Sequence, residues 1–282
     1  MNPTSNGSEL RGATLYFDCA TGLAGDMTMA ALLDLGVPEP FVREQLALLP
    51  LSNWELRIST VTKRGLVGKK VDVIDLGEPL HAHRHRHHGD IAHHHQHRDR
   101  HDGPHDHDEP HHHEDRHRHD EHHLHEDDHE HPHTHYAEIR RLLLGAPLLS
   151  DVKTRALRMF DRLAEVEAAM HGVTISEVMF HEVGALDSIV DIVGVAAALS
   201  WLTPRRIVCR TVPLGSGRVR TAHGLLPIPA PATAALLKGA LVEAGDLLGE
   251  LTTPTGALIV ATHADSYGPM PPLRIVATGH GA

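Results

Sequence analysis

The chain has 282 residues, a formal charge of −11, two cysteines and nine aromatic residues. The segment from His81 to His135 carries 14 acidic residues and 6 arginines, a balance of −8, which leaves only −3 for the other 227 residues. This near-neutral remainder lacks the basic surface that nucleic-acid binding requires. Two cysteines argue against a disulfide framework. Because no apolar leader or membrane-spanning run is present, we expect a cytoplasmic protein without a membrane partner.

Short apolar runs bounded by turn residues predict strands, and apolar residues at helical spacing predict helices. Strands are expected at residues 14–18, 54–62, 66–76, 206–212 and 273–278. Helices are expected at residues 27–35, 38–49, 136–144, 152–171, 231–237 and 254–264, the last with Thr253 as its N-cap. We therefore predict a mixed α+β fold in which small sheets are covered by helices. Residues 1–12 are expected to be disordered, and 13–76 with 136–282 to form one region.

The first predicted strand ends in a glycine turn that leads into a helix. This arrangement offers backbone amides to a phosphate at the helix N-terminus, although a Gly-x-x-Gly turn is more often only a turn. Gly22, Gly25 and Asp26 are the candidate phosphate contacts. Asp18 at the strand end and Asp26 at the helix start would favour a cation there instead, or a metal-bridged phosphate.

The segment of residues 77–135 has a different composition. From residue 81 to 135 it holds 24 histidines in 55 residues, interleaved with Asp and Glu and nearly without apolar side chains. Such a segment cannot bury a core, so we expect a disordered insertion. Imidazole binds nickel, zinc, copper and cobalt, and the irregular spacing indicates a reservoir or capture tether; a pH-sensitive solubilising linker is the alternative. Adjacent histidines are the expected ligands: His93, His94, His95, His111, His112, His113, His122 and His123.

A buried helix is predicted after a short acidic stretch in the second half of the chain. Thr174 and Glu177 have capping-box spacing, which predicts a short helix over 175–184. Asp187 is the expected N-cap of a second helix, 188–202, which is apolar on nearly all sides and therefore buried.

The acidic stretch itself is the strongest chemical signal in the sequence. His181, Glu182, Asp187 and Asp191 fall within eleven residues, and the two aspartates share one helical face. An unpaired carboxylate at Asp191 would be costly inside an apolar helix, so a cation, a ligand or a donor network must compensate it. The structural alternative is that Asp187 only caps the helix and His181 only satisfies a core hydrogen bond.

A second histidine lies on an extended, proline-rich path over residues 222–233. His223 stands there between Ala222 and Gly224, where its ring can reach outward as a ligand or an acid–base group. A lone loop histidine usually has no such role. The sequence contains no P-loop, Rossmann fingerprint, paired Cys-x-x-Cys, Gly-x-Ser-x-Gly or His-Glu-x-x-His motif, which narrows the enzyme classes.

Six stretches in order resemble the LarC family of nickel insertion proteins. They are Leu15–Gly36, Phe180–Asp191, Ala222–Gly224, Pro227 with Pro229–Thr233, Thr253–Gly256 and Gly268–Pro272. The resemblance covers nearly the whole chain outside its tails, and the histidine-rich insertion fits it. One departure is Cys19-Ala20-Thr21, where the family often has Phe-Ser at the last two positions, so no role is assigned to these side chains.

The resemblance implies insertion of Ni(II) into pyridinium-3,5-bisthiocarboxylic acid mononucleotide with hydrolysis of CTP, which yields the nickel-pincer cofactor of lactate racemase-type enzymes. It implies a lyase-class nickel insertase that uses Ni(II), and CTP with Mg(II) or Mn(II). Under this reading His181, Glu182, Asp187 and Asp191 form the metal or base cluster, with Asp18 and Asp26 nearby. Gly22 to Gly25 hold the substrate phosphate, and His223 is a further cofactor contact. The tract raises the local nickel concentration by tethering, to around millimolar for a flexible link.

The family normally continues beyond the point where this chain ends, and the resemblance places nucleotide binding in that C-terminal part. We therefore expect the chain to be an N-terminal portion that acts with a separately encoded partner, and a homo-oligomer is possible. Two other functions remain open: a nickel store or metallochaperone without catalysis, and a metal-dependent hydrolase that uses His181 and the aspartates.

Overall fold

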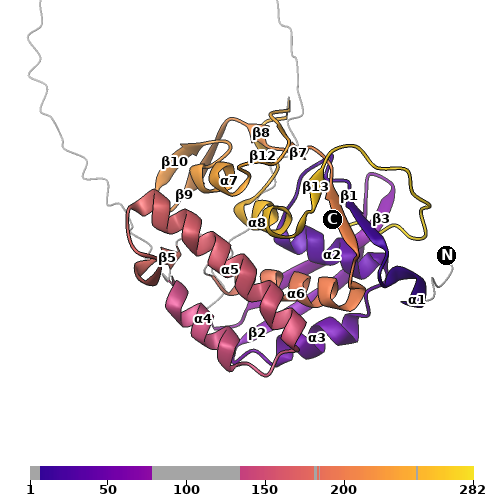
Figure 1. Cartoon of the computed structure of the whole chain (residues 1–282), viewed down its shortest axis with the longest axis horizontal. Coiled ribbons are helices and arrows are strands. Elements are labelled where there is room, and N and C mark those ends of the chain that lie inside the picture. Colours follow the sequence, from indigo (N-terminus) through magenta and orange to yellow (C-terminus); the bar gives the residue numbers. More distant parts are fainter. Residues whose placement is uncertain (1–6, 78–133, 181–182, 184, 246) are drawn as a thin grey trace, which may run out of the picture. The chain divides into compact units, whose positions relative to one another are not determined.

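The computed structural model describes residues 7–77, 134–180, 183, 185–245 and 247–282. Within them, the segments on both sides of the histidine-rich tract form one compact unit (Figure 1). The helices are α1 Gly7–Leu10, α2 Gly25–Leu35, α3 Glu39–Ala47, α4 Tyr136–Gly145, α5 Ser150–His171, the 3₁₀ turn η1 Ile175–Glu177, α6 Leu186–Leu202, α7 Pro231–Leu236 and α8 Pro254–His263. The strands are β1 Thr14–Phe17, β2 Trp54–Lys63, β3 Leu66–Asp75, β4 Thr134–His135, β5 Met179–Phe180, β6 Arg206–Cys209, β7 Val212–Pro213, β8 Gly215–Ser216, β9 Arg218–Thr221, β10 Gly224–Pro227, β11 Val242–Glu243, β12 Gly249–Glu250 and β13 Ser266–Tyr267.

The sheets are small, as the sequence predicted. One has three parallel strands in the order β1-β6-β13, with Phe17 beside Cys209. The long hairpin β2–β3 and the short pairs β9–β10, β7–β11, β8–β12 and β4–β5 complete the described pairings. The mixed α/β fold is therefore confirmed. Because parallel strands end at the same edge of a sheet, the residues after β1 and β6 lie together, and such an edge is where ligands commonly bind.

The core is built around α6. Its length is almost entirely apolar, and the residues from Ile192 to Leu199 are fully buried. Helices α2, α3, α5 and α8 all contact it (Figure 1). Gly194 permits the close crossing of α2, since a methyl group there would overlap Sδ of Met29. A carboxylate on α6 is thus surrounded by helices on several sides.

Four local expectations are wrong or incomplete. The short helix expected at 175–184 is only the three-residue turn η1, although its capping box forms as predicted. The chain then turns into β5, which pairs with β4 from the other side of the tract and buries Phe180 against Tyr136 and Phe160. Residues from distant parts of the chain override the local helical signal here.

The other three wrong or incomplete expectations concern the start of α6 and two strands. Asp187 is not the N-cap of α6, because Ala185 holds that position and Asp187 lies in the first turn. The strand expected at 206–212 divides into β6 and β7, which pair with different strands. No strand forms at 273–278, and the last strand of the chain is β13, which pairs with β6.

The last residues of the chain pack against α2 and β3. The backbone amide of His280 donates to the Asp34 carboxylate at 2.9 Å, and its carbonyl accepts from the Lys69 amide at 3.0 Å. Gly279 and Gly281 are required there, because a methyl group at either would overlap the backbone of α2.

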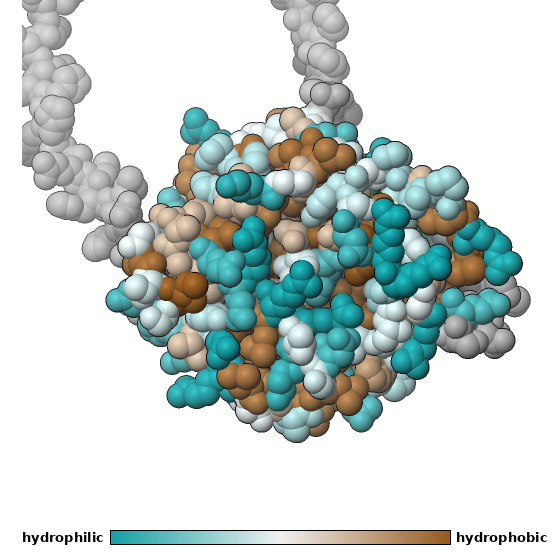
Figure 2. Space-filling model, viewed as in Figure 1, coloured by the Kyte–Doolittle hydropathy of each residue, from teal (hydrophilic) through white to brown (hydrophobic). Residues whose placement is uncertain are grey.

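Within the described residues, no helix has both the length and the hydrophobicity needed to cross a bilayer. On the face shown in Figure 2, hydrophilic and hydrophobic side chains are interspersed.

Candidate functional site

Asp191 lies where three helices meet. It stands on α6 beside Gly25, the first residue of α2, and Thr255, in the first turn of α8. The approach is tight: a methyl group added at Gly25 would lie 2.7 Å from Oδ2 of Asp191 and 2.8 Å from Cγ2 of Thr255. Two helix N-termini therefore adjoin one carboxylate, and helix N-termini favour negative charge.

The carboxylate of Asp191 is only partly satisfied. Its Oδ1 atom is buried and accepts no hydrogen bond from any of the described residues. Burial raises the pKa of Asp191 well above its usual value, and the Asp26 and Asp187 carboxylates raise it further, while the Asp26 backbone amide acts in the opposite direction. A buried acceptor without a donor destabilises the fold, so a proton or a bound cation at Oδ1 would compensate it.

Asp26 is the second acid of this group and is half-buried. Burial raises the pKa of its carboxyl, and the Asp72 carboxylate on β3 raises it further, while the Met27 amide lowers it. Asp72 in turn accepts a hydrogen bond from Lys70. Asp187, one turn before Asp191 on α6, is exposed, and its Oδ1 atom accepts from the Ser188 amide at 2.7 Å.

The glycine turn is held by hydrogen bonds within the protein. The Gly22 amide donates to the Cys19 carbonyl at 3.1 Å and the Leu23 amide to the Leu251 carbonyl at 2.9 Å. Gly22 has a φ of 131°, and a side chain there would collide with the Leu251 carbonyl. Because these two amides are engaged, they do not point to a phosphate in this conformation.

Asp18 belongs to the edge of the three-stranded sheet. Its carboxylate accepts from Arg210 at 3.1 Å, and both residues are exposed. Next to them the buried thiols of Cys19 and Cys209 lie 3.8 Å apart. A hydrogen bond from Cys209 lowers the pKa of Cys19, and the same interaction raises the pKa of Cys209.

His223 lies in the β9–β10 turn and meets a histidine that sequence reasoning did not single out. Its ring centroid is 5.1 Å from that of His171, the last residue of α5, with the planes inclined by 39°. Nε2 of His171 lies 3.2 Å from Oε2 of Glu167, one turn earlier. The i, i+4 spacing of Glu167 and His171 was readable in the sequence, but their approach to His223 was not.

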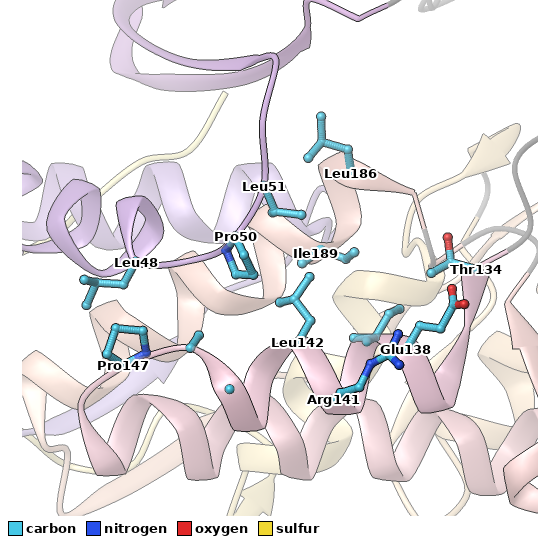
Figure 3. A pocket seen from close by; sticks show the side chains of 13 residues that line it. Leu48, Pro50, Leu51, Thr134, Glu138, Arg141, Leu142, Pro147, Leu186 and Ile189 are labelled. Carbon is cyan, nitrogen blue, oxygen red and sulfur yellow. The ribbon is translucent and has the colours of Figure 1, made fainter.

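Two cavities flank these groups. One, of about 1010 Å³, lies between β1, α2 and the C-terminal segment, and Asp18, Cys19 and Gly22 line it. The other, of about 780 Å³, opens between α4, the start of α6 and the segment after α3. Figure 3 shows Leu186 and Ile189 of α6 on one side of it. Arg141, Glu138 and Thr134 supply its polar groups.

His181 and Glu182 lie outside the described residues, as do the tract histidines His93, His94, His95, His111, His112, His113, His122 and His123. Among the residues that the structure does describe, no group of three or more His, Cys, Asp or Glu side chains is arranged to hold a metal ion. The described residues therefore provide two separate groups: the carboxylates around Asp191, and the imidazoles of His171 and His223.

The family model for "Nickel insertion protein" matches residues 15–282. The chain belongs to the nickel insertion protein family. Two relatives are named putative nickel insertion proteins. The protein of Geobacter sulfurreducens is 40% identical over 270 residues, and that of Geotalea uraniireducens is 41% identical over 270 residues. Each alignment covers 95% of this chain and 56% of the relative. A Geobacillus kaustophilus relative is 39% identical over 268 residues, 95% of this chain and 55% of its own, and is named pyridinium-3,5-bisthiocarboxylic acid mononucleotide nickel insertion protein.

The chain thus spans about half the length of these nickel insertion relatives. No solved structure was found that matches the chain significantly. Membership of the family bears out the resemblance that the six sequence motifs indicated.

Proposed function

We propose that this chain carries out nickel insertion into pyridinium-3,5-bisthiocarboxylic acid mononucleotide, as the name of the Geobacillus kaustophilus relative describes. In this reaction two thiocarboxylate sulfurs and one ring carbon bond to Ni(II), and the proton on that carbon leaves to a base. The protein must therefore release nickel from water, hold an anionic mononucleotide and accept a proton.

The observation that best supports the proposal is the buried, partly unsatisfied carboxylate of Asp191. A carboxylate with a raised pKa is a stronger base than an exposed one, and it also attracts a cation. We propose that Asp191 and Asp187 act with His181 and Glu182 as the metal or base cluster. The side chains of Asp26 and Asp18 are proposed as further acidic groups toward the ion.

The 780 Å³ cavity is the proposed place of the mononucleotide (Figure 3). On α6 it is lined by Leu186 and Ile189, five and two residues before Asp191, and Arg141 offers a cation to the phosphate. The turn from Gly22 to Gly25 is the alternative phosphate site, but its first two amides already bond to protein carbonyls. Arg141→Ala is expected to weaken substrate binding and leave nickel binding unchanged.

We further propose that CTP is hydrolysed in the reaction, with Mg(II) or Mn(II), through a C-terminal part that acts together with this chain. A test combines the chain with that partner, nickel, CTP and the dithio-mononucleotide, and detects the metallated product by mass spectrometry. Asp187→Asn with Asp191→Asn is expected to abolish the product. Glu165→Gln, an exposed acid of α5 that pairs with Arg162, is the matched control. Undiminished product from the double aspartate variant would refute the cluster.

A nickel store or metallochaperone is the second candidate, and the 24 tract histidines favour it. Removal of residues 81–133 separates the two, because β4 begins at Thr134 and remains to pair with β5. A store should lose most of its metal capacity, whereas an insertase should keep its activity when nickel is plentiful.

A further inference from the structure

The thiols of Cys19 and Cys209 form a buried pair that the proposed insertion reaction does not use. Their sulfurs lie 3.8 Å apart, and they are the only two cysteines of the chain. Cys19 follows β1 and Cys209 is the last residue of β6, so two neighbouring parallel strands bring together residues that are 190 positions apart. Any disulfide within one molecule must therefore join these two sulfurs.

The distance between the sulfurs is short enough for a disulfide to form with local movement. A disulfide bond holds its sulfurs about 2.05 Å apart, so the two must approach each other by roughly 1.8 Å. Cys209 lies on β6, the middle strand of its sheet, whereas Cys19 lies in the loop after β1. We therefore expect Cys19 to make most of this movement.

Of the two thiols, Cys19 is the one that a small oxidant can reach. It lines the cavity of about 1010 Å³ together with Asp18 and Gly22, whereas Cys209 is fully buried. The hydrogen bond from Cys209 also lowers the pKa of Cys19. Since peroxides oxidise the thiolate form, Cys19 is the thiol that is attacked first.

The reaction balances with hydrogen peroxide as the oxidant. The Cys19 thiolate attacks one peroxide oxygen, the O–O bond breaks, and the products are a sulfenic acid at Cys19 and a hydroxide ion. The Cys209 thiol then loses its proton, and its sulfur displaces hydroxide from the sulfenic acid as the S–S bond forms. That hydroxide takes up the proton and becomes water. The negative charge on Cys19, which raised the pKa of Cys209, has by then been removed, so Cys209 ionises more readily.

We propose that Cys19 is a site of reversible oxidation by peroxides, with Cys209 as the resolving thiol, and that the resulting disulfide ties the end of β1 to the end of β6. The proposal stands on the distance between the sulfurs, on the cavity beside Cys19 and on the burial of Cys209. A reducible bond between two thiols of this kind is typical of redox sensing.

The disulfide would act on the start of α2. The Cys19 carbonyl accepts from the Gly22 amide at 3.1 Å, and the turn from Gly22 leads to Gly25, which packs against Asp191. A shift of Cys19 toward Cys209 therefore moves the turn that positions Gly25. We expect oxidation to lower nickel transfer, and this consequence rests on the proposed function, whereas the disulfide itself does not.

The test treats the full, folded chain with hydrogen peroxide in the presence of EDTA, which removes metal ions that would themselves oxidise thiols. The expected product is a monomer in which the peptides of Cys19 and Cys209 are joined with the loss of two hydrogens, and dithiothreitol should reverse it. The joined peptide is read after proteolysis, because the seven methionines also take up oxygen. In urea the two thiols are no longer held together, so the same disulfide should form about tenfold more slowly, or slower still.

Variants of each cysteine distinguish the two roles. In Cys209→Ser the sulfenic acid of Cys19 should persist and be trapped by dimedone, whereas in Cys19→Ser the remaining thiol of Cys209 should react about tenfold more slowly. The proposal would be overturned by peroxide that leaves both thiols of the wild type unmodified, joins two chains, or oxidises Cys19 further without a joined peptide. These wild-type outcomes decide the question even where a variant does not fold.

The outcome is separable from that of the proposed function. Product formation by a chain that forms no disulfide in peroxide would overturn the modification site and leave the insertion reaction standing. A disulfide in a chain that gives no product, whether reduced or oxidised, supports the site and counts against the insertion reaction. A disulfide that leaves product formation unchanged supports the site and overturns its effect on α2.

Discussion

Gly25→Ala tests how tightly the Asp191 environment is packed. The added methyl group would lie 2.7 Å from Oδ2 and 2.9 Å from Cβ of Asp191, and 2.8 Å from Cγ2 of Thr255. Since ordinary contacts begin near 3.4 Å, each neighbour must move by roughly 0.5–0.7 Å, and overpacking of this kind costs about 1–3 kcal/mol. Backbone strain is not a factor, because Gly25 has no positive φ.

Thermal unfolding followed by circular dichroism measures this loss. For a structured region of this size, 1–3 kcal/mol corresponds to a decrease of roughly 2–12 °C in Tm. Gly145→Ala is the matched control: it lies at the end of α4, and a methyl group there meets nothing within 4 Å. That variant should melt at the wild-type temperature or slightly above it, since Ala favours a helix more than Gly does.

A double variant shows whether the loss arises at Asp191. In Gly25→Ala with Asp191→Ala, the nearest colliding atom is absent, so the combined loss should be smaller than the sum of the single losses by about 0.5–1 kcal/mol. Additive losses, or an unchanged Tm in Gly25→Ala, would refute the contact. Gly25→Ala should also lower nickel transfer, because Asp191 must move.

Three further predictions concern titratable groups. Burial raises the pKa of Asp191, so the stability of the wild type is lost as pH rises through the folded-state pKa. In urea unfolding at pH 8 without nickel, Asp191→Asn should therefore be about 1–3 kcal/mol more stable than the wild type, and this difference should disappear at low pH. A difference that is equal at all pH values would contradict the reasoning. Burial lowers the pKa of His263 from 6.5 to about 4, so the free energy of unfolding should decrease by about 3 kcal/mol as pH falls from 6.5 to about 4. In urea titrations, His263→Gln should not show this decrease. Cys19 lines a cavity and has a lowered pKa, whereas Cys209 is fully buried and has a raised pKa. Iodoacetamide should therefore modify Cys19 before Cys209, as followed by mass spectrometry, and the reverse order would refute the assigned pKa directions.

The local elements were largely predictable. The hairpin β2–β3, the helices α5 and α6 and the capping box at Thr174 follow from patterns within one or two turns. Thr253 caps α8 as predicted, with Oγ1 accepting from the Gly256 amide at 3.2 Å. Asp191 was likewise expected to be a costly acid on a buried helix, since the apolar residues around it in the sequence already required burial.

The strands with which these elements pair could not be predicted from the sequence. Residues 179–180 of the expected helix pair instead with β4, which precedes α4 just after the histidine-rich tract. The strand expected at 273–278 does not form, and Ser266–Tyr267 pairs with β6. The roles of His181, Glu182 and the tract histidines remain predictions, because these residues lie outside the described part of the chain.

The sequence by itself determined the family, the mixed fold class and the residue types available for nickel, because motifs and hydrophobic periodicity are local. Only the tertiary structure placed Asp191 at the N-terminus of α2, Cys19 beside Cys209 across 190 positions, and His223 against His171. These contacts depend on how helices and strands pack as a whole. Segments far apart in the chain meet only when burying the core brings them together, and no pattern within a single segment records that outcome.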